Sequence, residues 1–317
     1  MITAFMTTLA QMARILLFLV TGFCLNRLHI LRKETGICIS RLVTMVFLPA
    51  MVIYTNMMEF NLANVGSYGI LVLSGGLLWT VVMLLMQPVA KKMGGGSFQE
   101  RGVYLYGLSF PNTGAVGTPL VLALLGTAGL FRFNLFLLVF SIMTYAWGVG
   151  LFLDMERKNP VKRFFIHLFN PVFISMLIGM LLGAFGARNW MPDLITNFVG
   201  DLGSCYVPIS LLLTGFSIAD YPMNDVFNRP KSYLFTLLRL IVIPLFVLGI
   251  AFLLKLPLDI AILIVLAFAG PSGMNVVVFP ASYGQDCRTG ASIVLLSSLG
   301  SIITVPILYA LVQYFFT

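Results

Sequence analysis

The chain alternates long apolar stretches with short polar breaks, and ten of the apolar stretches are long enough to cross a bilayer. A membrane-spanning helix needs about 20 mostly apolar residues. The first span begins almost at Met1 without a basic segment or cleavage pattern, so we expect it to be retained rather than removed as a signal peptide. We predict an all-α membrane protein with spans at residues 3–25, 36–58, 66–90, 98–125, 130–153, 169–186, 194–218, 232–254, 258–283 and 290–315.

Two of these spans, the fourth and the ninth, carry helix-breaking sequences at mid-length. The first break reads LSFPNTG at 108–114, and the second reads AGPSGMN at 269–275. Proline lacks a backbone donor and clashes with the preceding turn, so neither span is expected to form one smooth helix. Hydrocarbon tolerates such breaks only where protein or a water-filled cavity surrounds them. Matching broken helices in two halves of a chain indicate the substrate site of a secondary transporter.

The two halves of the chain repeat one another at a nearly constant spacing. Pro111 and Pro271, in the two breaks, are 160 residues apart, and Gly126 and Gly284, which close the broken spans, are 158 apart. Because each half has an odd number of spans, the second copy starts on the opposite side of the membrane. We therefore predict two inverted five-helix repeats in which helices 4 and 9 cross. The predicted units are residues 1–153, a cytoplasmic linker at 154–168, and residues 169–317.

Lys and Arg residues are distributed very unevenly between alternate loops. If both termini lie outside, the outer loops hold two of them, Arg188 and Lys255, and the cytoplasmic loops hold thirteen. Short cytoplasmic loops of membrane proteins carry such an excess of basic residues. The bias predicts that both termini lie outside the cytoplasm. The thirteen are Arg27, Arg32, Lys33, Lys91, Lys92, Arg101, Arg157, Lys158, Lys162, Arg163, Arg229, Lys231 and Arg288.

The composition excludes several other classes of protein. The chain of 317 residues is 59% hydrophobic and 9% charged, whereas a soluble domain has roughly 25% charged residues. The net charge of +8 lies mostly in loops that orient the protein, so no nucleic-acid partner is predicted. The four cysteines are scattered singly, there are two histidines, and no HExxH or GxSxG motif occurs. We therefore expect no metal, no cofactor and no enzymatic activity.

The breaks are the predicted substrate site, because of what they do to the backbone. The second half of each broken helix would present unpaired N–H groups that suit an anion, and the first half would present carbonyls that suit a cation or polar groups. An alternative is that Asn112 and Asn275 only cap half-helices and touch no ligand. The predicted substrate-binding residues are Pro111, Asn112, Thr113, Gly114, Pro271, Ser272, Gly273 and Asn275.

Charged residues inside spans are rare and are taken first as functional candidates. Arg14, in the middle of the first span, would either attract an anionic substrate or pair with Asp201 in the seventh. Asp201 would either couple transport to a proton or cation, or form a structural ion pair. Arg41 and Arg239 lie near cytoplasmic span ends, where their long stems are expected to snorkel toward water.

Three sequence motifs resemble those of the auxin efflux carrier family. The segment GLSFPNTGAVGTPL at 107–120 is similar to that family's fourth-span signature, and FLPA at 47–50 is similar to its second-span motif. YGQD at 283–286, followed by Ala291 and Ser292, resembles the end of its ninth span and the start of its tenth. The resemblance covers essentially the whole chain, and the short linker resembles that of bacterial members, which include permeases for malate, malonate and related organic acids.

This resemblance implies a fold shared with sodium–bile acid symporters. Spans 1, 2, 6 and 7 would form a scaffold domain, and spans 3–5 and 8–10 would form a transport domain. The family's asparagine at the crossing maps onto Asn112, and the second break matches less well, at Asn275. A homodimer through the scaffold is a further implication.

These patterns lead to one preferred function and several alternatives. The preferred one is a secondary transporter that moves a small organic anion, such as a monocarboxylate or dicarboxylate, across the plasma membrane by an elevator-type mechanism. One alternative is a sodium-coupled importer of larger amphipathic anions similar to bile acids. A passive channel is a second alternative, although paired broken helices favour alternating access.

Overall fold

The computed structural model describes residues 2–152, 171–219, 227–282 and 285–316, and within these ranges the chain is helical with no β-strand. Seven helical segments are long and apolar enough to cross a membrane. The prediction of an all-helical chain is confirmed for the described residues, and seven helices suit a multi-pass membrane protein, whereas ten spans and inverted repeats stay predictions. The predicted linker at 154–168, Tyr283 and Gly284 lie outside the described residues. The seven segments are Met6–Arg27, Glu34–Glu59, Leu62–Gly94, Thr113–Phe136, Asp193–Ile218, Pro230–Leu253 and Arg288–Phe316.

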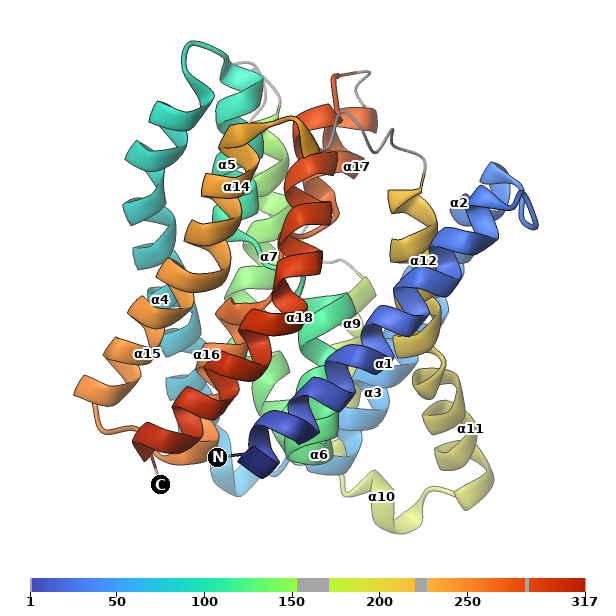
Figure 1. Cartoon of the computed structure of the whole chain (residues 1–317). Helices are drawn as coiled ribbons and strands as arrows, with labels where there is room; N and C mark the ends of the chain where they lie inside the picture. The colour runs from blue at the N-terminus through green and yellow to red at the C-terminus, as the bar shows by residue number, and fades with distance from the viewer. Residues whose placement is uncertain (1, 153–170, 220–226, 283–284, 317) are drawn as a thin grey trace.

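Helices in the first half of the chain follow the predicted order, and the fourth predicted span is divided at its break (Figure 1). Residue Gly126 has a left-handed φ of 67°, which interrupts α6 where the predicted fourth span ends. The elements are α1 (Ile2–Arg27), α2 (Lys33–Leu42), η1 (Val43–Phe47), α3 (Leu48–Glu59), η2 (Leu62–Asn64), α4 (Val65–Gly94), α5 (Phe98–Ser109), η3 (Thr113–Gly117), α6 (Thr118–Phe136), α7 (Leu138–Ala146) and η4 (Gly148–Leu151).

The second half is divided at its own break, between α16 and α17. Of its apolar helices, α9 and α16 are shorter than the length that a full crossing needs. The elements are α9 (Pro171–Ala184), α10 (Ala187–Trp190), α11 (Asp193–Ser204), α12 (Tyr206–Ile218), α14 (Pro230–Leu237), η5 (Leu238–Val242), α15 (Ile243–Leu253), α16 (Leu258–Ala269), α17 (Asn275–Ser282) and α18 (Arg288–Phe316).

Three short π-helical turns, η1, η3 and η5, each end two residues before a proline: Pro49, Pro119 and Pro244. Proline in a regular helix clashes with the carbonyl group four residues earlier. The wider π turn, which bonds residues five apart, accommodates the proline while the helix continues. Such turns often mark functional positions, and η3 lies at the first break while η5 carries Arg239.

One group of helices packs through small residues. α1 packs against α12, and α3 packs against α9 and α11. A Cβ added at Gly22 of α1 would lie 2.0 Å from the backbone oxygen of Leu212, and one added at Gly215 of α12 would lie 1.9 Å from that of Leu19. These glycines let the two helix backbones touch, which is how helices associate in lipid, where the hydrophobic effect gives no drive.

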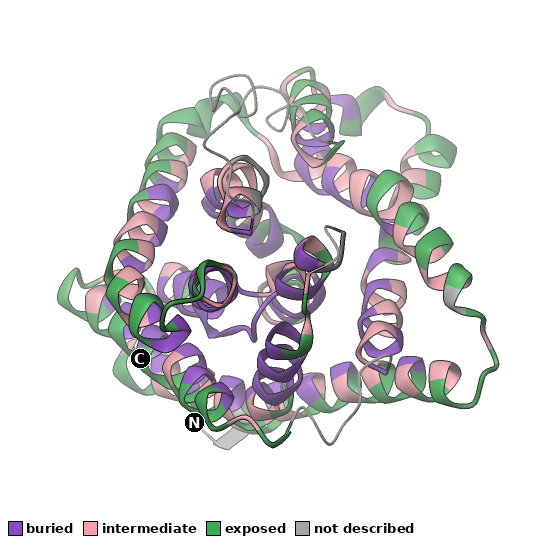
Figure 2. Ribbon diagram, turned by 90° about the horizontal axis from the view of Figure 1, so that it is seen from above, coloured by how far each residue is buried: buried purple, intermediate pink, exposed green. Residues whose placement is uncertain are grey.

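A second group of helices contains most of the buried core. α4 packs on α5, α6 and α7, while α18 packs on α14, α15 and α16. Every residue of α16 from Ala261 to Ala269 is buried. Figure 2 shows the buried residues on the inner faces of the helices and the exposed ones around the rim. Large apolar side chains such as Leu73, Leu77 and Leu194 are exposed, as expected of a protein surface that faces lipid.

Polar contacts tie helices together at the end of the bundle that lies opposite the two chain termini. The start of α1 and the end of α18 lie at one end (Figure 1), as the predicted ten spans would require. The opposite end is tied together by polar contacts: Lys231 donates to the Met93 carbonyl over 2.8 Å, and Arg229 donates to the Thr289 hydroxyl over 2.8 Å. There the Arg288 backbone N–H, 2.9 Å from the carboxylate, lowers the pKa of Asp286.

Candidate functional site

The two breaks meet backbone to backbone. An antiparallel bridge joins Pro111 to Ser272. The Asn112 N–H donates to the Pro271 carbonyl over 2.7 Å, and the Gly273 N–H donates to the Phe110 carbonyl over 3.2 Å. The main chains of two segments that are far apart in the sequence therefore satisfy one another at the point where both helices are interrupted.

Arg239 satisfies carbonyl groups of both helices that end at the breaks. Its side chain is 0% exposed. The guanidinium donates to the Leu108 carbonyl over 3.0 Å, the Phe268 carbonyl over 3.0 Å and the Gly270 carbonyl over 3.1 Å. The prediction that Arg239 snorkels toward water is wrong, because its partners lie inside the protein. The carbonyls predicted to suit a cation are occupied by this side chain.

The helix that follows the first break is capped by Asn112. Its side-chain Oδ1 accepts a hydrogen bond of 3.1 Å from the Ala115 N–H, at the start of η3. At the second break, the Ser272 N–H donates to the Ser297 hydroxyl of α18 over 3.1 Å. Capping was one of two predicted roles for Asn112, and it leaves the amide nitrogen of the same side chain for a second role.

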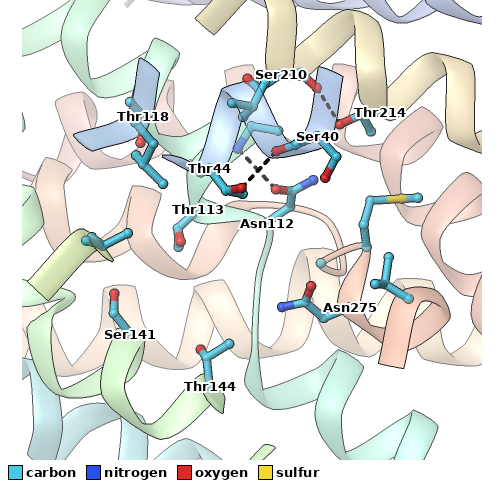
Figure 3. A pocket seen from close by; sticks show the side chains of 18 of the residues that line it. Ser40, Thr44, Asn112, Thr113, Thr118, Ser141, Thr144, Ser210, Thr214 and Asn275 are labelled. Carbon is cyan, nitrogen blue, oxygen red and sulfur yellow. Dashed lines mark hydrogen bonds between the residues drawn. The ribbon is translucent and has the colours of Figure 1, made fainter. Parts of the chain in front are cut away.

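A cavity of about 830 Å³ lies against the first break. We call it the central cavity. Its walls come from α2, η1, α3, α9 and α12 on one side and from α5, η3, α6, α7 and α17 on the other. Figure 3 shows Asn112 and Thr113 in this cavity together with Asn275 from the second break. Of the predicted site residues, those that line it are Pro111, Asn112, Thr113, Gly114, Gly273 and Asn275.

Four predicted residues do not line the central cavity. Pro271 and Ser272 lie in the main chain of the second break, and Ser272 is 0% exposed. Arg14 and Asp201 are both exposed, on α1 and α11, and within the described part of the chain no ion pair joins them. The structure therefore does not bring the two charged candidates to the cavity.

The structure brings hydroxyl residues from three different helical segments to the central cavity, a pattern that the sequence analysis does not use. They occur at intervals of three or four residues, which places each pair on one helix face. Several already donate to their own helix: Thr44 to the Ser40 carbonyl over 2.9 Å, and Thr214 to the Ser210 carbonyl over 2.8 Å. The sequence signal that would have identified them is pairs of hydroxyl residues, three or four positions apart, inside apolar spans. The pairs are Ser40 and Thr44, Ser141 and Thr144, and Ser210 and Thr214.

Arg41 is the charged residue of the central cavity. Among the described residues that line the cavity, no other is charged. It lies on α2, next to Ser40 and one helical turn before Thr44, and it is exposed. The sequence analysis gives Arg41 a snorkelling role. An arginine whose side chain extends to bulk water and one whose side chain extends into an internal cavity have the same sequence pattern.

One wall of the central cavity is aromatic. Tyr106 stacks on Phe110 with ring centroids 4.5 Å apart, and Phe110 contacts Phe140 at 5.3 Å. Tyr106 also accepts a hydrogen bond of 2.8 Å from the Asn275 side-chain amide, which fixes both residues. The cavity thus combines a flat apolar wall with polar groups, the usual composition of a small-molecule site.

Close contact between the two sides of the cavity occurs at Gly114. A Cβ added there would lie 2.6 Å from the Tyr206 hydroxyl oxygen of α12. Only glycine therefore lets the first break approach α12 this closely.

Within the described part of the chain, no group of three or more His, Cys, Asp or Glu residues lies close enough to hold a metal ion.

Comparison with family models matches residues 7–309 to the family of membrane transport proteins. The chain belongs to this family. A search of the curated proteins finds no match. The family match covers both breaks and all the helices that line the central cavity, so this transport-family protein carries its candidate site inside the matched region.

Proposed function

We propose that this protein is a secondary transporter of small organic anions and that the central cavity is its substrate site. The observation that carries the proposal is the charge of the cavity. Its described lining includes one cation, Arg41, and no carboxylate. The amino end of η3 and α6, which carries a partial positive charge, begins at its wall. Both features favour an anion over a cation or a neutral solute.

The lining also favours a substrate with an apolar body. Phe140, Phe173 and Phe279 line the cavity together with Tyr106. A carboxylate on an aromatic or short aliphatic frame would place its charge near Arg41 and its frame against these rings. We therefore propose monocarboxylates as the preferred class, with dicarboxylates such as malate or malonate as the class to compare with them.

The position of the cavity supports alternating access. One wall belongs to the predicted scaffold spans, represented by α2, α3, α9 and α12, and the other belongs to the predicted transport spans. A site between two groups of helices can be exposed to either face when one group moves against the other. We propose an elevator-type movement of this kind in the plasma membrane, with both termini outside and a homodimer through the scaffold.

The test is uptake by purified protein in liposomes, measured with radiolabelled benzoate, indole-3-acetate, malate and malonate. Wild-type protein should concentrate or exchange at least one of them, and an excess of the unlabelled acid should compete. Liposomes containing the Arg41→Gln variant are the matched control, because that change removes the charge of the cavity and leaves the protein in place. Uptake of none of the acids by a folded protein would refute the proposal.

A further inference from the structure

Arg239 is a buried charge without a carboxylate partner among the described residues, and its setting is unusual. It is held in η5, a π-helical turn, and is 0% exposed. Burying a charge is very costly unless it is hydrogen-bonded. Here three carbonyl oxygens, of Leu108, Phe268 and Gly270, supply those bonds at 3.0 to 3.1 Å.

These carbonyls lie at the carboxyl ends of two different helices, α5 and α16. Each helix end carries roughly half a negative charge, so the two ends together present roughly one, which one guanidinium balances. The planar fork of arginine can donate to acceptors on two backbone segments at once, whereas a lysine ammonium is a compact point charge. The side chain therefore matches the two ends in charge and in shape.

Carbonyl oxygens at interrupted helices are also the groups that coordinate a sodium ion in secondary transporters. We propose that Arg239 is the resident cation of this crossing: it takes the place of an inorganic ion, fixes α5 and α16 in register, and leaves substrate binding independent of sodium. The proposal deepens the proposed function, since it concerns the coupling of that same site. Arg239 is a positioning residue in this scheme, because it acts on the cavity through the backbone of the breaks.

The test uses thermal unfolding of detergent-purified full-length protein, which requires no substrate. The variants are Arg239→Ala and, as matched control, Arg132→Ala, which removes an exposed arginine that pairs with Asp259. Arg239→Ala should unfold at a clearly lower temperature. Methylguanidinium chloride should raise that temperature, because a ligand that binds only the folded state stabilises it. N-methylurea, which is neutral and similar in shape, should not.

Two outcomes of this experiment would overturn the proposal. One is an Arg239→Ala protein as stable as the wild type. The other is equal rescue by methylguanidinium and N-methylurea, which would show that the side chain only fills space. Rescue of Arg132→Ala or of the wild type by methylguanidinium would show that the effect is not specific to the crossing, and would count against it equally.

A second measurement decides the case if Arg239→Ala does not fold. Wild-type protein is unfolded in sodium, potassium and N-methylglucamine chloride at equal ionic strength, and benzoate uptake is measured with and without sodium. The proposal expects the same unfolding temperature and the same uptake in all three salts. A selective stabilisation by sodium, or uptake that falls roughly tenfold or more without it, would refute the resident cation. Absence of uptake of benzoate and of the other three acids in every salt would instead count against the proposed function.

Discussion

The Asn112 N–H lies 2.7 Å from the Pro271 carbonyl, so the main chain of the first break is bonded to that of the second. The same residue uses its side-chain oxygen to cap the following helix through Ala115. It also lines the central cavity. One asparagine therefore joins the two breaks, begins a helix and faces the proposed substrate, and substitutions can separate the last two roles.

Replacing Asn112 by Asp or by Ala should have different effects on stability and on binding. Asn112→Asp keeps an acceptor for the Ala115 N–H, so its unfolding temperature should stay near that of the wild type. Asn112→Ala loses the cap and should lose about 1 kcal/mol of unfolding free energy. Both should bind benzoate at least about tenfold more weakly, since the amide donor is gone from each. Thermal unfolding and benzoate binding on the same samples check this. Wild-type benzoate affinity in Asn112→Asp would show that the Asn112 amide nitrogen does not contact the substrate.

Neutralising Arg41 should weaken anion binding without unfolding the protein. A hydrogen bond to a charged group is worth about 1.5–3 kcal/mol, so Arg41→Gln should lower benzoate affinity by about 10- to 150-fold. Arg41→Lys keeps the charge, and its benzoate affinity should lie between those of the wild type and Arg41→Gln. Arg132→Gln, which changes an exposed arginine outside the cavity, is the control and should bind as the wild type does. Equal losses in Arg41→Gln and Arg132→Gln would indicate a general charge effect rather than a contact.

The breaks could be predicted from sequence because their cause is local. Pro111 and Pro271 lack a backbone N–H donor, and their positions can be read directly from the sequence. In the structure both helices are interrupted there. The end of the predicted fourth span at Gly126 has the same origin in backbone geometry, with its φ of 67°. Elements of this kind depend on one residue and its neighbours, so no knowledge of the fold is needed.

The role of Arg239 could not be predicted, because its partners carry no side-chain signature. It bonds to backbone carbonyls that are 29, 31 and 131 residues away in the sequence. Any residue can supply a carbonyl, so the pattern of residue types does not reveal which ones converge. For Asp201 and Arg14, the sequence instead suggests an interaction that the structure does not contain. Two opposite charges in apolar stretches suggest an ion pair, but both residues are exposed.

Alanine at the glycines between α1 and α12 should destabilise the protein. A Cβ at Gly22 or Gly215 would meet backbone oxygen at 2.0 Å or 1.9 Å, so the helices must separate. Overpacking of this kind typically costs about 1–3 kcal/mol. Gly249 of α15 is the matched control, since a Cβ there meets nothing within 4 Å. Gly249→Ala should be neutral or stabilising by up to about 1 kcal/mol, because alanine favours helix. Equal unfolding temperatures for all three variants would contradict the close packing.

Gly114 and Tyr206 should behave as a coupled pair. Gly114→Ala places a Cβ 2.6 Å from the Tyr206 hydroxyl oxygen, so the first break must move away from α12 and the central cavity must change shape. We expect lower benzoate uptake in this variant. Tyr206→Phe removes the atom that the new Cβ would meet, and the remaining ring atoms lie at least 4.0 Å away.

The double variant should therefore recover the uptake of Tyr206→Phe alone. A thermodynamic cycle over the wild type, the two single variants and the double variant measures this coupling, which for residues in contact is typically about 0.5–3 kcal/mol. The cycle should be run on binding as well as on uptake. Coupling in both would place the contact in the substrate-bound conformation. Additive losses, with no recovery in the double variant, would mean that α12 and the first break do not meet at this point during transport.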